Sequence, residues 1–149
     1  MTNILGTNNS VIVDSDALIG LIHENDLLHK RCVKISDYLA QNNFVTIVCY
    51  TTVLEASTTL SRSINRPDLA KKLLQDFAQI KQPSFLEIGI APLVAEAFDE
   101  KASKRNTPFD HYVAAVAKLN DIKLVFSFDS FYEKQGLKLL EKNTYSSQE

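Results

Sequence analysis

The amino-acid sequence predicts an α/β domain in which helices cover both faces of a mostly parallel sheet. Short runs of β-branched and aromatic residues alternate along the chain with longer segments whose apolar residues recur at helical spacing. The 149 residues are the size of one domain, and no linker or low-complexity tract divides them. We therefore expect one domain over residues 1–143 and a flexible tail over residues 144–149.

The first half of the chain predicts two strands and four helices. Residues 11–13 form an apolar strand that ends at Asp14, and the apolar run after it predicts a short helix ending near Asn25. Asp26 is the expected N-cap of a second helix that ends near residue 43. Residues 44–50 are β-branched and aromatic and predict a strand. A third helix is expected over residues 51–63, and Pro67 suits the first turn of a fourth, which ends near residue 80.

The second half continues the alternation. Residues 85–90 predict a third strand and residues 91–105 a fifth helix. Thr107 and Pro108 open a sixth helix. Residues 123–128 predict a fourth strand, and residues 137–140 a short strand at the edge of the sheet.

Composition narrows the class of protein. Sixteen basic and 18 acidic residues give a net charge of −2, so no basic field covers the whole domain. A site built from several carboxylates would make the net charge of the chain more negative even if the surface around the site were basic. Neither a signal peptide nor a transmembrane run is apparent, and Cys32 and Cys49 form no paired motif. We expect a cytoplasmic protein, not bound to a membrane, with both thiols reduced in or near its core.

Acidic residues recur where strands end and helices begin. Asp14 closes the first strand, with Asp16 two residues on, and Asp129 closes the fourth. Glu55 and Asp110 lie in the predicted first turns of two helices. The carboxyl ends of parallel strands meet at one edge of a sheet, where ligands bind in such folds. Four or five acids are therefore expected in one pocket.

Each acid alone also has a structural explanation. Residues 52–55 and 107–110 fit the capping-box pattern, Asp16 would cap the first helix, and Asp129 would form a turn. The set is harder to explain, because two carboxylates ~5 Å apart repel by roughly 3 kcal/mol at an effective dielectric constant of ~20. A cluster without basic partners would be protonated or would hold a cation. Oxygen ligands favour Mg²⁺ or Mn²⁺ over zinc.

Four motifs carry a resemblance to a known family. They are Val-Ile-Val-Asp-Ser-Asp at residues 11–16, Val-Leu-Glu-Ala at 53–56, Phe-Asp-His-Tyr-Val-Ala-Ala-Val-Ala at 109–117, and Phe-Ser-Phe-Asp-Ser-Phe-Tyr at 126–132 followed by Gly136. In this order and spacing, the sequence resembles the PIN-domain family of metal-dependent ribonucleases, and within it the VapC-type toxins of toxin–antitoxin pairs. The resemblance implies a three-layer α/β/α fold with a mostly parallel central sheet of four to five strands. It also implies an acidic pocket that binds one or two Mg²⁺ or Mn²⁺ ions.

The resemblance assigns roles residue by residue. The expected catalytic and metal-binding residues are Asp14, Glu55, Asp110 and Asp129, supported by Ser15, Asp16 and Ser127. Among these, Asp14 and Asp110 are the expected direct ligands, and a water activated by the metal would attack the RNA phosphodiester. Asp16 stands where the family often has Asn, which leaves its role as a ligand open. Tyr132 stands where the family usually has Phe, and is interpreted as a packing variation.

Partners follow from the same resemblance: an RNA substrate, an antitoxin protein and a second copy in a homodimer. The candidate contacts to RNA phosphates are Arg62, Arg66, Lys104 and Arg105, although charged runs on helices are usually just solvated. His111 adjoins Asp110 but points away from it on a helix, which favours a surface or packing role. The apolar positions of the third and fourth helices would form either a docking groove or the domain's own core.

Three alternatives remain at this point. The chain could be a PIN-domain nuclease for housekeeping RNA processing, with the same pocket. Asp14-Ser15-Asp16 also mimics the nucleophile and acid/base pair of haloacid-dehalogenase-like phosphatases, but the chain lacks a convincing Gly-Asp-x-x-x-Asp motif near its end. Finally, the fold could serve as a binding module whose pocket has lost its metal.

Overall fold

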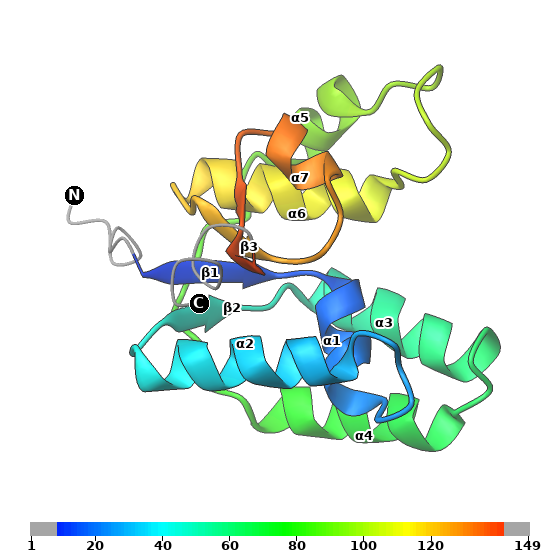
Figure 1. The fold of residues 1–149 in the computed structure, drawn as a ribbon. Coiled ribbons are helices and arrows are strands. Elements are labelled where there is room, and N and C mark those ends of the chain that lie inside the picture. Colours follow the sequence, from blue (N-terminus) through cyan, green and yellow to red (C-terminus); the bar gives the residue numbers. More distant parts are fainter. Residues whose placement is uncertain (1–8, 142–149) are drawn as a thin grey trace.

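A four-stranded parallel sheet forms the middle layer of the computed structural model, which describes residues 9–141 (Figure 1). The strand order is β2-β1-β3-β4. The elements are β1 (Ser10–Val13), α1 (Ser15–Ile22), α2 (His29–Gln41), β2 (Val45–Ile47), α3 (Tyr50–Arg62), α4 (Pro67–Gln79), α5 (Ile90–Ala97), α6 (Pro108–Leu119), β3 (Leu124–Phe126), α7 (Phe131–Lys134) and β4 (Lys138–Leu139).

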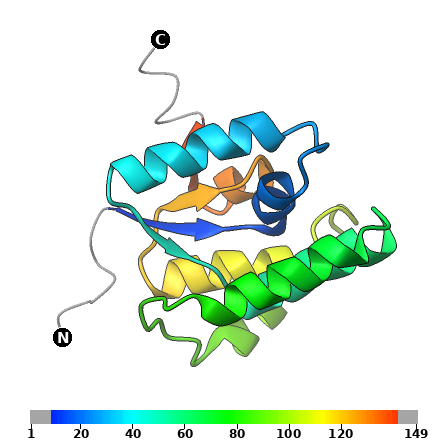
Figure 2. The same ribbon diagram turned by 90° about the horizontal axis from the view of Figure 1, so that it is seen from below.

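The central strand β1 separates two hydrophobic cores. Its side chains alternate between the two faces of the sheet. Ile12 packs into a core with α5, α6 and α7, whereas Val11 and Val13 pack into a second core with α1 to α4. Figure 1 shows these two groups of helices above and below the strands, and Figure 2 shows the sheet between α2 and α6. The expected α/β/α layering and parallel sheet are confirmed.

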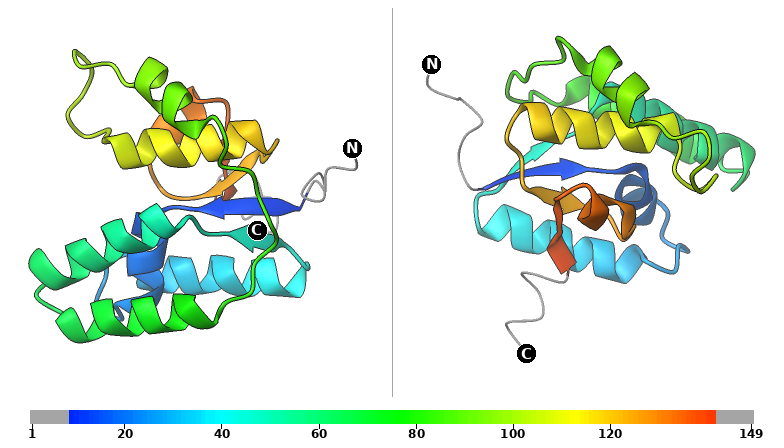
Figure 3. Two further views of the ribbon diagram at one scale, coloured as in Figure 1. Left: turned by 180° about the vertical axis from the view of Figure 1, so that it is seen from behind. Right: turned by 90° about the horizontal axis from the view of Figure 1, so that it is seen from above.

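The strand predicted at residues 85–90 is wrong, because the segment after α4 pairs with no strand of residues 9–141. Side-chain amides, and not a neighbouring strand, make hydrogen bonds along this segment. The Asn120 carboxamide accepts from the Leu86 N–H and donates to the Leu86 carbonyl, both at 3.0 Å. The Gln82 carboxamide makes the same pair of bonds with Val48, also at 3.0 Å. The segment thus stays extended while it passes the sheet on its way from α4 to α5 (Figure 3).

Several predicted boundaries also shift. The second helix begins at His29, because the Asp26 carboxylate accepts from the Leu28 N–H at 2.8 Å in a turn and caps no helix. The fifth helix ends at Ala97, and a loop of residues 98–107 leads to α6. The strand over residues 44–50 shortens to Val45–Ile47, and the short helix α7 was not predicted. The predicted domain limit at residue 143 and the tail over residues 144–149 lie outside the described residues.

The described cysteines agree with the expectation from sequence. Cys32 and Cys49 are both free and buried. Cys32 fills the space beside Gly20, where an added Cβ would lie 2.4 Å from its sulfur, so α1 and α2 approach each other closely there. Over residues 9–141, no helix is both long and apolar enough to cross a membrane.

Candidate active site

The predicted acids line one cleft: Asp14 and Asp129 follow strands β1 and β3, whereas Glu55 and Asp110 lie on helices α3 and α6. The cleft has a volume of about 290 Å³. Its lining comes from the turn after β1, the helices α1, α3 and α6, the loop before α6, and the turn after β3. The lining residues are Asp14, Ser15, Asp16, Ile19, Glu55, Thr59, Arg105, Thr107, Asp110 and Asp129.

Three of these acids form a tight cluster. One carboxylate oxygen each from Asp14, Glu55 and Asp110 lies within 4.8 Å of the other two. Asp14 is only 4% exposed and Asp110 8%. Among the ion pairs of residues 9–141, none includes a member of the cluster. Like charges at this spacing repel by roughly 3 kcal/mol per pair at an effective dielectric constant of ~20, so the cluster requires protons or a cation.

Burial changes the acidity of the cluster. The pKa of Asp14 is raised from 3.8 to about 8, mainly by burial and also by the charges of Asp16 and Asp110, against opposing effects from Tyr132 and Ser15. Burial is also the main reason why the pKa values of Glu55 and Asp110 are raised. Without a bound cation, Asp14 is therefore mostly protonated at pH 7.

Two members of the cluster also cap helices. Asp14 is the N-cap of α1 and accepts from the Ser15 N–H at 2.7 Å. Asp110 accepts from the Thr107 N–H at 2.8 Å through Oδ2, which confirms the capping-box interpretation at α6. The same interpretation is wrong for Glu55, because α3 begins at Tyr50 with Cys49 as its N-cap. Glu55 therefore lies beyond the first turn, and its buried Oε1 has no hydrogen-bond partner among the described residues.

The remaining two acids line the cleft but are not part of the cluster. Asp129 lines the cleft, and its Oδ1 accepts from the Phe131 N–H at 2.9 Å. Asp16 does not cap α1, since Asp14 is the N-cap. Its carboxylate instead reaches the turn after β3, where it accepts from the Ser127 hydroxyl and the Phe128 N–H.

The family model of the PIN domain matches residues 11–136, which is most of the chain. The chain belongs to the PIN domain family. The matched range contains every acid of the cleft.

A solved structure supports the fold of this PIN domain. The VapC20 toxin of Mycobacterium tuberculosis, described as cleaving the sarcin–ricin loop, superimposes with a TM-score of 0.70. The match covers 86% of this chain and 96% of that one, at 16% sequence identity. No curated protein matches the chain by sequence.

The donor set of this PIN domain suits a hard divalent cation. The cluster offers only carboxylate oxygens, and neither histidine nor cysteine lines the cleft. The partnerless Oε1 of Glu55 is a buried acceptor that a cation would satisfy. Asp14, Glu55 and Asp110 are thus the residues that would hold Mg²⁺ or Mn²⁺, and Asp129 lines the same cleft.

Of the four candidate phosphate contacts, only Arg105 lines the cleft. It does so from the loop before α6. Arg66 forms an ion pair with Asp68 and lines a different hollow beside α1 and α4. Arg62 ends α3, and Lys104 is exposed on the loop; neither lines the cleft.

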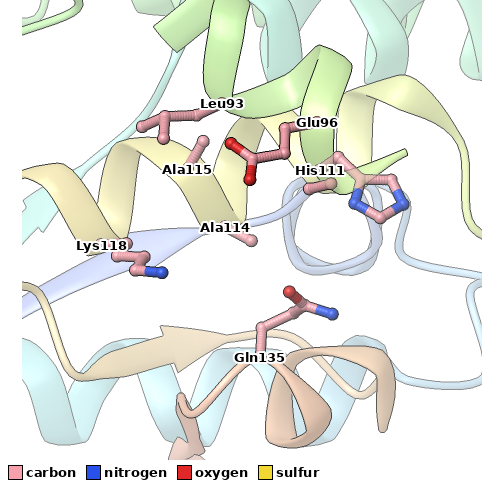
Figure 4. Close-up of a pocket in the computed structure, with 8 residues that line it drawn as sticks. Leu93, Glu96, His111, Ala114, Ala115, Lys118 and Gln135 are labelled. Carbon is pink, nitrogen blue, oxygen red and sulfur yellow. The ribbon is translucent and has the colours of Figure 1, made fainter. Parts of the chain in front are cut away.

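His111 and Tyr132 complete the surroundings of the cleft. His111 is buried between the rings of Phe98 and Phe131 and lines a separate hollow of about 350 Å³, formed mainly by α5 and α6 (Figure 4). This confirms its packing role. Tyr132 is fully buried, and its hydroxyl faces Asp14 and has no hydrogen bond of standard geometry among the described residues. Sequence reasoning missed this contact, although a tyrosine in an otherwise apolar position was the available signal.

Proposed function

We propose that this PIN domain is a metal-dependent endoribonuclease that hydrolyses RNA phosphodiester bonds at the acidic cleft. The observation that carries the proposal is the cluster of three carboxylate oxygens within 4.8 Å of one another, none of which forms an ion pair with a described residue. Either protonation of the carboxylates or a bound cation must offset their repulsion. Because the cluster offers only oxygen ligands, it favours one or two Mg²⁺ or Mn²⁺ ions. Membership of the PIN domain family supports the same activity.

Bound at such a site, a divalent ion lowers the pKa of a coordinated water and offsets charge on the phosphate. The residues of the chain would contribute binding and orientation. Asp14 and Asp110 are held by their helix-cap hydrogen bonds, so their carboxylates have fixed positions before any ligand arrives. Arg105 lines the cleft and would contact a phosphate of the RNA there. Asp129, which lines the cleft outside the cluster, would orient the attacking water.

The likeness to VapC20 suggests a more specific role. That protein is described as a toxin that cleaves the sarcin–ricin loop. We propose that this chain is likewise the toxin of a VapBC-type pair, that an antitoxin protein inhibits it, and that it forms a homodimer in the cytoplasm. Tyr50, Leu54 and Ile80 are 42–55% exposed on and just after α3 and α4, and offer apolar surface for such partners. Most other apolar residues of the two helices belong to the core.

Cleavage of RNA by the purified protein tests the activity. We expect single-stranded RNA to be cut when Mn²⁺ or Mg²⁺ is present and left intact when EDTA is added. Asp14→Asn and Asp110→Asn should each abolish cleavage while the circular dichroism spectrum stays native. Asp68→Asn is the matched control, because Asp68 is exposed and paired with Arg66 away from the cleft. Cleavage that persists in EDTA, or in both cluster variants, would refute the assignment.

Further measurements separate the alternatives. Growth arrest on expression of the active chain, relieved by co-expression of a neighbouring antitoxin gene, would favour a toxin over a housekeeping nuclease. Calorimetry that detects no Mn²⁺ binding at neutral pH would favour a binding module without metal. The phosphatase alternative loses its support, since the family match and the fold are those of a PIN domain.

A further inference from the structure

The turn that carries Asp129 is held by side chains and not by the sheet. The backbone hydrogen bonds between the β1 and β3 segments end with the bond from the Asp14 N–H to the Phe126 carbonyl at 3.1 Å. Beyond it, the Phe128 N–H donates to Asp16 Oδ2 at 2.8 Å, and the Asp129 N–H donates to the Ser127 Oγ at 3.1 Å. The position of Asp129 at the cleft therefore depends on these side-chain acceptors.

The two acceptors are themselves joined. The Ser127 hydroxyl donates to Asp16 Oδ2 at 3.0 Å, and Ser127 is only 2% exposed. One oxygen of Asp16 thus accepts two hydrogen bonds from a segment more than 100 residues away in the chain. Removing such a buried acceptor leaves its donors without partners, which costs more than the bond itself contributes.

The hydrogen bonds of Asp16 also distinguish it from the clustered acids. Its Oδ1 accepts from the Ala17 N–H at 2.8 Å, so both oxygens of Asp16 face donors of the protein. In contrast, Asp14, Glu55 and Asp110 each direct one oxygen into the cluster, and Asp16 is not part of that set. Asp16 lies two residues from Asp14 but serves a different element.

We propose that Asp16 is a positioning residue: together with Ser127 it fixes the turn that sets Asp129 at the cleft, and it does not itself bind the metal. The catalytic part of this inference rests on the proposed function of the cleft. The structural part does not, because it concerns only how the turn after β3 is held. The two parts can be tested separately.

The proposal predicts different outcomes for three variants. Asp16→Ala and Ser127→Ala should each lower kcat/KM for RNA by about 10- to 100-fold, the usual effect of removing a partner that orients a metal site. Asp16→Asn keeps one carbonyl oxygen as acceptor for Ser127 and Phe128, so it should restore activity to within about threefold of wild type. The loss in the double variant Asp16→Ala/Ser127→Ala should be smaller than the product of the two single losses, because the bond between Ser127 and Asp16 is removed by either substitution.

Hydrogen exchange supplies a readout that needs no activity. In Asp16→Ala the Phe128 amide should exchange faster than in the wild type, and the Asp129 amide with it. Asp26→Ala is the matched control, since it also removes a carboxylate that accepts from a backbone N–H, at a turn away from the cleft. It should leave both amides and the RNA cleavage unchanged.

Two results would overturn the proposal. An Asp16→Asn variant that loses as much Mn²⁺ affinity in calorimetry as Asp14→Asn would make Asp16 a ligand. Unchanged exchange at Phe128 and Asp129 in both alanine variants would show that the turn does not depend on Asp16 or Ser127. Failure of the wild type to bind Mn²⁺ or cleave RNA would instead refute the proposed function, while the exchange data would still decide the role of Asp16.

Discussion

Asparagine in place of Asp14 should stabilise the metal-free protein, although it abolishes the proposed activity. Asp14 is 4% exposed and lies next to two other carboxylates, and its pKa is raised to about 8. Folding at pH 7 therefore requires the protein to take up a proton that the unfolded chain does not hold. Asn is neutral in both states, and its carbonyl oxygen still accepts from the Ser15 N–H as an N-cap.

The size of the effect follows from proton linkage. A carboxyl whose folded pKa is raised binds more protons in the folded state, so stability falls as pH rises from the unfolded pKa to the folded one. Between 3.8 and about 8, this loss reaches about 4 kcal/mol at pH 7, at 1.36 kcal/mol per pH unit. We expect Asp14→Asn to recover about 2–4 kcal/mol, or roughly 4–15 °C in melting temperature for a chain of this size.

Thermal melts in EDTA from pH 4 to pH 8 measure this gain. The gain should be largest near pH 8 and should fall below about 1 kcal/mol near pH 4, where Asp14 is protonated in the folded wild type and about half protonated in the unfolded chain. Saturating Mn²⁺ should then stabilise the wild type by about 2.7 kcal/mol at 100 times its Kd, but not the variant. Asp68→Asn is the control, because Arg66 lowers the pKa of Asp68 to about 2 and the pH dependence has the opposite sign. A gain in Asp14→Asn that is the same at pH 4 and pH 8 would refute the reasoning.

Three further variants test other parts of the structure. Arg105→Ala should raise KM for RNA several-fold and leave Mn²⁺ affinity unchanged. Arg66→Ala should change neither KM nor Mn²⁺ affinity. If both variants changed KM equally in a cleavage assay, the phosphate contact would lie elsewhere. Tyr132→Phe should leave the fold intact but change Mn²⁺ affinity in calorimetry, because the hydroxyl faces a carboxylate of the cluster; an unchanged affinity would restore the packing interpretation. Asn120→Ala should lower the free energy of unfolding by about 1–3 kcal/mol in urea titrations, since it leaves both backbone groups of Leu86 without partners; a smaller loss would mean that water replaces the amide.

The layered fold was predictable because it depends on local patterns. Strand and helix periodicity identified β1, α3, α4 and α6 within a few residues, and parallel strands then had to end at one edge. The strand predicted at residues 85–90 failed for a reason that local patterns do not contain. Its backbone bonds go to the side chain of Asn120, 34 residues away, and a polar side chain gives no periodic signal.

The acids of the site were predictable as a set, but their individual roles were not. Their places at strand ends predicted a shared cleft, and the structure brings all of them to it. Whether an acid caps a helix depends on the residue at which that helix begins. The capping box needed Thr52 as the N-cap of α3, but the N-cap is Cys49, three residues earlier, so Glu55 lies beyond the first turn and its buried Oε1 has no partner among the described residues. The partners of Asp16 were hidden because they lie in the turn after β3, more than 100 residues away in the chain.

Capping and metal binding are not competing explanations for Asp14 and Asp110. A carboxylate has two oxygens, and a helix cap uses only one of them. In Asp110, Oδ2 accepts from the Thr107 N–H; in Asp14, Oδ1 accepts from the Ser15 N–H. Each bond fixes the rotation of the carboxylate, and both residues still place an oxygen within 4.8 Å of the others. The cap therefore pre-organises the ligand, so little side-chain entropy remains to be lost when a cation binds. Glu55 has no such cap and should be the most adaptable member of the cluster.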